Sequence, residues 1–132
     1  MATKTQDDVL RALLDTELIP EKDVFMKRFG VNFRIRAIDG RTINQMRELA
    51  TYPTKGGGKQ LDQEKFGALI IEKGCVVPDW TAPELLAKFG PTPADAIQKR
   101  LLAGEIAKLS NEILDLSGFD EDEAEAVEDV KN

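Results

Sequence analysis

The spacing of apolar residues changes near Asp39 from a period of two to one of about 3.6, and this change most constrains the fold. Over residues 31–38 apolar and polar side chains alternate, which is typical of a strand with one buried face. A second strand-like run, "KDVFMKRF", precedes Gly30, and glycine can take the positive φ of a tight turn. The pattern predicts an antiparallel β-hairpin near residues 22–38, followed by about four or five helices in a helix-rich α+β domain.

Helical spacing and capping residues predict further helices over residues 5–19, 38–52, 62–74, 81–90, 92–104 and 105–118. Asp62 and Thr92 are predicted N-caps, because their side chains can accept hydrogen bonds from backbone N–H groups of the first turn. Gly74, Gly90 and Gly104 are predicted helix ends, since glycine commonly follows the last helical turn. In the first helix after the hairpin, the predicted inward residues are Ile43, Met46, Leu49 and Ala50.

The last helix carries a narrow apolar seam formed by Ile106, Leu109, Ile113 and Leu116. This spacing is typical of helix-on-helix packing. One interpretation is contact with the chain's own core, and the other is contact with another chain, including self-association. The helix is too short for an isolated coiled coil, so packing in the chain's own core is favoured.

The stretch "YPTKGGGKQ" invites comparison with a phosphate-binding loop. A Walker loop reads G-x-x-x-x-G-K-[ST], so a core at Gly58 and Lys59 requires glycine at position 53 and a hydroxyl at position 60. The chain has Pro53 and Gln60 there. We therefore predict that this stretch is a flexible linker that does not bind ATP or GTP.

The chain has one cysteine, Cys75, and no histidine. This excludes an internal disulfide, zinc sites built from Cys and His, and nucleophilic catalysis that needs a histidine base. Cys75 is predicted to pack as a small hydrophobic residue. Neither a clustered carboxylate site nor a long apolar run is visible, so we expect no metal, no cofactor and no membrane span. The N-terminus lacks the apolar stretch of a secretory signal, which favours a cytosolic protein.

The net charge of −6 is carried by the last residues, 119–132, where seven acidic side chains accompany one lysine. The remaining chain is neutral, which gives no support to nucleic-acid binding, since that requires a basic face. Acidic runs of this kind are usually disordered and solubilising. The predicted organisation is therefore one globular domain over residues 1–118 and a disordered acidic tail over residues 119–132.

Three stretches together resemble one group of proteins. They are "KRFGVNFRIRAIDGRTINQMRELAT", "DQEKFGALIIEKGCVVPDW" and "PELLAKFGPTPADAIQKRLLAGEIAKLSNEILDLSGFDED". In this order and spacing they resemble the tail assembly chaperones of bacteriophages with contractile tails, the XkdN-like group. The resemblance covers Lys27 to Asp122, and its most specific part is "LLAGEIAKLSNEILDLSGF".

This resemblance implies a non-enzymatic role in the host cell cytoplasm. Chaperones of this group bind the tape measure protein and keep it soluble until tail tube subunits polymerise around it. Some members also exist in a frameshift-extended form that recruits the tube protein, and the chaperone is absent from the mature virion. The alternative within the same context is a minor structural or connector subunit of the tail.

A chaperone for a long amphipathic helix needs an apolar binding surface. The candidate partner-binding residues are Trp80, Leu85, Phe89, Ile106, Leu109 and Ile113. Trp80 and Phe89 are aromatic anchors of the kind that contribute most to interfaces. The alternative for both is ordinary core packing, more so for Phe89, which follows two leucines.

Overall fold

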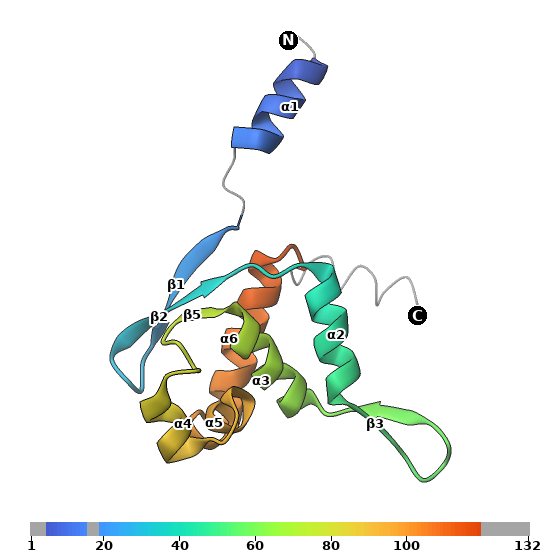
Figure 1. Ribbon diagram of the computed structural model, residues 1–132, viewed down its shortest axis with the longest axis vertical. Helices are drawn as coiled ribbons and strands as arrows, with labels where there is room; N and C mark the ends of the chain where they lie inside the picture. The colour runs from blue at the N-terminus through green and yellow to red at the C-terminus, as the bar shows by residue number, and fades with distance from the viewer. Residues whose placement is uncertain (1–4, 16–18, 120–132) are drawn as a thin grey trace.

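The computed structural model describes residues 5–15 and 19–119, and Figure 1 shows how its elements are arranged. The helices of these residues are α1 (Gln6–Asp15), α2 (Gly40–Ala50), α3 (Gln63–Gly74), α4 (Pro83–Phe89), α5 (Pro93–Arg100) and α6 (Ala103–Leu116). The strands are β1 (Glu21–Met26), β2 (Val31–Arg36), β3 (Thr51–Pro53), β4 (Lys59–Leu61) and β5 (Cys75–Val77). This composition confirms the predicted helix-rich α+β fold.

The predicted N-terminal hairpin is confirmed. Strands β1 and β2 pair antiparallel, with Val24 opposite Phe33, and Gly30 closes the turn with φ of 68°. A third strand, not predicted from the sequence, completes this sheet. Strand β5 follows α3 directly and pairs with the other edge of β2, which gives the order β1-β2-β5.

The core lies between one face of this sheet and the pair α3 and α6, which run side by side (Figure 1). From the sheet, the buried side chains are Val24, Met26, Phe33 and Ile35. Helix α3 is buried on most of its surface over residues 66–71, and α6 contributes the seam residues Ile106, Leu109 and Ile113. Packing in the chain's own core, the favoured interpretation of that seam, is therefore confirmed for these three residues.

Helices α3 and α6 approach each other closely because two glycines lie at their contact. A Cβ atom added at Gly67 would lie 2.8 Å from Cγ2 of Ile106, and one added at Gly74 would lie 2.7 Å from Cγ2 of Ile113. Real side-chain carbons pack at about 3.5–4.0 Å. A larger residue at either position would therefore push the helices apart or displace the isoleucine.

Local hydrogen bonds fix the helix ends that the sequence predicted best. Asp62 accepts a hydrogen bond from the Lys65 backbone N–H at 3.1 Å, and Thr92 accepts one from Asp95 at 3.2 Å. Helix α3 ends at Gly74 and α4 ends just before Gly90, as predicted. Gly90 has a φ of −62°, which any residue can adopt. Glycine is required there because there is no room for a side chain: an added Cβ would lie 2.4 Å from the Leu86 carbonyl oxygen.

Several predicted helix boundaries are wrong. The helix expected to run to Tyr52 ends at Ala50, because Thr51–Pro53 pairs with β4 as strand β3. The helix expected to open at Thr81 begins at Pro83, because the Asp79 carboxylate accepts hydrogen bonds from both the Thr81 N–H and hydroxyl and holds that residue in a turn. The helix expected to end at Gly104 ends at Arg100. Gly104 is instead the second residue of α6, because Leu101 leaves the helix in an extended conformation and is buried.

The predicted inward face of α2 is also too wide. Ile43, Met46 and Ala50 are buried as expected, but Leu49 is 58% exposed. At 3.6 residues per turn, the side chains of Ile43, Met46 and Ala50 point the same way from the helix axis, and that of Leu49 points to one side of them. The N-terminal helix, predicted over residues 5–19, ends at Asp15 in the described structure, and residues 16–18 lie outside it.

The glycine-rich stretch is the tip of a second hairpin instead of a simple linker. Strands β3 and β4 pair antiparallel, and Thr54 donates its N–H to the Gly58 carbonyl at 2.9 Å. Gly57 has φ of 84°, a left-handed conformation that glycine adopts easily. The mobility predicted for this stretch stays a prediction, and the acidic tail from residue 120 onward lies outside the described residues.

Candidate partner-binding face

Helix α4 packs against the core and stays partly exposed. None of its residues is fully buried, although it carries Leu85, Leu86 and Phe89. Phe29, in the turn between β1 and β2, is also partly buried. We call this surface the aromatic–cation face and define it as Phe29, Leu85, Leu86 and Phe89 together with Arg28, Lys88 and Arg100.

Three cations lie over the two aromatic rings of this face. The guanidinium carbon of Arg100 is 4.7 Å from the ring centre of Phe29 and 5.7 Å from that of Phe89. Arg28 lies 4.4 Å from the centre of Phe29, and the Lys88 ammonium lies 5.7 Å from that of Phe89. A cation within about 6 Å of a ring centre is attracted by the negative face of the ring. Arg100 therefore bridges two rings that come from distant parts of the chain.

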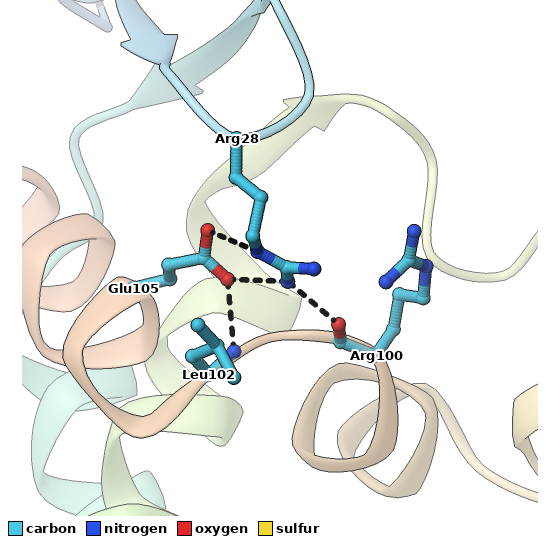
Figure 2. Close-up of polar contacts among 4 residues, drawn as sticks. All are labelled: Arg28, Arg100, Leu102 and Glu105. Atoms are coloured by element: carbon cyan, nitrogen blue, oxygen red, sulfur yellow. Dashed lines mark hydrogen bonds and ion pairs between the residues drawn. The ribbon is translucent and has the colours of Figure 1, made fainter.

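Arg28 is held in place by Glu105, at the start of α6 (Figure 2). Its Nε donates to Oε2 of Glu105 at 3.0 Å and its terminal nitrogen donates to Oε1 at 2.6 Å. The same terminal nitrogen donates to the Arg100 carbonyl at 3.2 Å, and Oε1 of Glu105 also accepts the Leu102 N–H at 2.9 Å. This clasp fixes the β1–β2 turn against the junction of α5 and α6.

The clasp also favours the charged forms of Arg28 and Glu105. Hydrogen bonding from Arg28 lowers the pKa of the Glu105 carboxyl, and this outweighs the opposing effect of burial. The same hydrogen bonds raise the pKa of Arg28. In the described part of the chain, the Arg100 guanidinium makes no ion pair or hydrogen bond. Among these residues its charge acts through space on Glu105 and helps to lower the pKa of that carboxyl, while the two rings restrict its position.

The aromatic–cation face is coupled to the core through stacked rings. Phe29 stacks on Phe33 with ring centres 6.0 Å apart, and Phe33 meets Trp80 edge-on at 6.4 Å. Trp80 is only 4% exposed. A row of three aromatic side chains therefore connects Phe29 to the buried Trp80.

Comparison with known proteins places this fold in a family. The family described as phage XkdN-like tail assembly chaperone protein matches residues 10–131. The chain belongs to this family. The match confirms the resemblance drawn from the sequence. Among its relatives is the uncharacterized protein YqbN of Bacillus subtilis (strain 168), 32% identical over 122 residues, covering 86% of this chain and 82% of YqbN.

Another relative of this XkdN-like chaperone is the phage-like element PBSX protein XkdN of the same organism. It is 27% identical over 122 residues, again covering 86% of this chain and 82% of the relative. The crystal structure of YqbN is similar in three dimensions, with a TM-score of 0.60 and 27% sequence identity. That similarity covers 80% of this chain and 90% of the YqbN chain.

The six residues predicted to bind a partner fall into two groups in the chaperone. Leu85 and Phe89 are partly buried and lie on the aromatic–cation face. Trp80, Ile106, Leu109 and Ile113 are buried in the core. Phe29, Arg28 and Arg100 were not among the residues predicted from the sequence. An aromatic residue beside arginine in "KRFG" is a usable signal, because both residue types are enriched at interfaces.

A groove of about 440 Å³ lies between α3 and α6 of the chaperone, apart from the residues of the aromatic–cation face. Small side chains make up much of its wall. Its lining residues are Gln63, Glu64, Phe66, Gly67, Ala103, Ile106, Ala107, Ser110, Asn111 and Leu114. The groove is partly polar, and its lining residues include no lysine or arginine.

Reactive groups are few in the chaperone. Burial raises the pKa of the Cys75 thiol to about 11, and the side chain packs against the core as predicted. The thiol is therefore protonated at neutral pH. Within residues 5–15 and 19–119 there is no cluster of Asp, Glu, His or Cys side chains placed to hold a metal ion. None of the helices in this region combines the length and the apolar character needed to cross a bilayer.

Proposed function

We propose that this chain is a non-enzymatic chaperone that binds amphipathic helical segments of the tape measure protein through the aromatic–cation face. By covering apolar residues of those segments, it keeps the tape measure protein soluble until tail tube subunits assemble. Family membership supports the assembly role. The observation that carries the choice of surface is the group of partly exposed Phe and Leu side chains surrounded by arginine and lysine.

The composition of this face suits a protein interface better than a small-molecule site. Interfaces are enriched in aromatic residues and arginine, and their strongest contacts cluster at the centre of a patch. Arg100 is already held between Phe29 and Phe89, so its side chain would lose little conformational entropy on binding a partner carboxylate. Leu85 and Leu86 extend the apolar area along α4, where a partner helix could lie.

The buried members of the predicted set take an indirect part in this proposal. Trp80 supports Phe29 through Phe33, and Ile106, Leu109 and Ile113 fix α6, which carries Glu105 and so holds Arg28. In the assembly pathway, the chaperone then acts in the host cytoplasm, helps to recruit tail tube subunits and leaves before the virion is complete. It uses no cofactor and no nucleic acid.

Co-expression with the cognate tape measure protein tests the proposal. The chaperone should keep that protein in the soluble fraction and co-purify with it, and moderate salt should not separate them because apolar burial supplies most of the free energy. Phe89→Ala should weaken the complex by about 2 kcal/mol, as expected for an aromatic anchor. Arg100→Glu should also weaken it.

Leu49→Asp is the matched control, since Leu49 is an exposed leucine on α2 outside the face. Circular dichroism must show that each variant stays folded. A chaperone that ignores the tape measure protein and is found stoichiometrically in mature tails would contradict the proposal. It would instead support a structural or connector subunit.

A further inference from the structure

Helix α1 carries an exposed apolar stripe. No residue of α1 is buried, and Figure 1 shows it apart from the domain. Its apolar side chains are exposed by 45% at Val9, 44% at Leu10, 69% at Leu13 and 78% at Leu14. A free helix of ten residues is marginal in water, so helical structure here is favoured by a surface that covers this stripe.

The charges of α1 and of the aromatic–cation face are opposite. The helix carries Asp7, Asp8 and Asp15 against Arg11. On the other side, residues 27–30, α4 and α5 together carry Lys27, Arg28, Lys88, Lys99 and Arg100 against Glu84 and Asp95, and Arg28 is already paired with Glu105 of α6. Because the body of the chain is neutral overall, this basic excess is local. An acidic amphipathic helix therefore matches the face in both apolar character and charge.

The position of α1 favours docking on the aromatic–cation face of another molecule over docking on its own. Helix α1 leads into the start of β1, whereas the face lies past the opposite end of that strand, where Phe29 follows Met26 (Figure 1). The strand is about 17 Å long at the usual rise per residue. The chain from Asp15 to Glu21 spans about 20 Å when fully extended. A molecule's own α1 would thus reach its own face only with this whole segment stretched along β1.

We propose that α1 of one copy docks on the aromatic–cation face of a second copy. Two copies exchange their α1 helices reciprocally, in a symmetric dimer with two identical contacts. The stripe of Val9, Leu10, Leu13 and Leu14 covers Phe29 and the apolar side of α4, and an α1 carboxylate pairs with Arg100. The contact and its test involve no tail protein and so do not depend on the proposed function. Only one consequence rests on that function: a tape measure segment and α1 would compete for the same face.

Analytical ultracentrifugation of the full chain over a range of concentrations tests the proposal. The unmodified protein should be a dimer in equilibrium with monomer. Leu13→Asp combined with Leu14→Asp should raise the dimer dissociation constant at least about tenfold, and Arg100→Glu should do the same. Neither α1 leucine packs in the domain, so the double variant should keep its fold. Leu49→Asp, which changes an exposed leucine outside both surfaces, should leave the dissociation constant unchanged.

Mixing the two variants decides whether the contact is between copies. The α1 double variant retains an intact face and the Arg100 variant retains an intact α1, so an equimolar mixture restores one of the two contacts. We expect a heterodimer to form at concentrations where each variant alone is monomeric. The proposal is overturned if the unmodified protein is monomeric throughout, if the mixture stays monomeric, or if Leu49→Asp dissociates the dimer equally.

Discussion

Gly74→Ala should destabilise the domain, although alanine is the better helix former. The added Cβ would lie 2.7, 2.8 and 3.1 Å from Cγ2, Cδ1 and Cγ1 of Ile113, and that side chain is completely buried. Since carbon atoms pack at about 3.5–4.0 Å, the overlap is several tenths of an ångström at three atoms. Overpacking of this kind costs about 1–3 kcal/mol. The gain in helix propensity is at most about 1 kcal/mol, and less for the last residue of a helix.

The expected net loss in the free energy of unfolding is therefore about 1–2 kcal/mol. Urea denaturation followed by the fluorescence of the single tryptophan, which is buried, measures it directly. Gly104→Ala is the matched control, because an added Cβ there meets no atom within 4 Å and the residue is the second of α6. That control should be neutral or stabilising by up to about 1 kcal/mol.

A double-mutant cycle with Ile113→Ala isolates the contact. In that background the Ile113 atoms that Cβ would meet are gone, so Gly74→Ala should cost nothing or stabilise. The expected coupling free energy is about 1 kcal/mol or more. An equal cost of Gly74→Ala with and without Ile113 would refute the packing argument, and so would equal effects of the Gly74 and Gly104 substitutions.

Four further outcomes are expected. Glu105→Gln should lower the free energy of unfolding, measured by urea denaturation at pH 7, by about 1 kcal/mol. Because the folded pKa of Glu105 is lowered, this difference should be complete above the ordinary carboxyl pKa of about 4.3 and should shrink as pH falls through the folded value. Trp80→Ala should lower the free energy of unfolding by about 3–5 kcal/mol. Circular dichroism should therefore show loss of folded structure, and a binding assay on this variant would not be informative. Asp62→Ala should cost about 1 kcal/mol through loss of the α3 cap, measured by thermal unfolding. ATP and GTP should give no heat in titration calorimetry, and a micromolar affinity that Lys59→Ala removes would contradict this.

The features that could be predicted from the sequence are those whose causes are local. The alternation around Phe33 and Ile35 and the positive φ of Gly30 specify the hairpin within a few residues of chain. Asp62 and Thr92 cap helices through hydrogen bonds to residues three positions later. Patterns of this range are visible in any window of about ten residues.

The features that were missed depend on contacts between distant segments. Strand β5 has only three residues, and it is a strand because β2 is there to pair with it. The glycine at position 74 was predicted as a stop signal, but its small size is needed for Ile113, which lies 39 positions later. The aromatic–cation face joins Phe29 to Arg100 in the same way. No local pattern could have shown which arginine lies over which ring.

Helix α6 is the last described element to be synthesised, and this order has a kinetic consequence. It supplies Ile106, Leu109 and Ile113 to the core, and its Glu105 closes a contact with Arg28 across 77 positions. A nascent chain that lacks α6 leaves the inner side of the hairpin and α3 without their main partner. Closing such long loops is slow compared with forming local helices. The domain should therefore reach its native state only after synthesis of α6, so that nascent chains expose apolar surface until then.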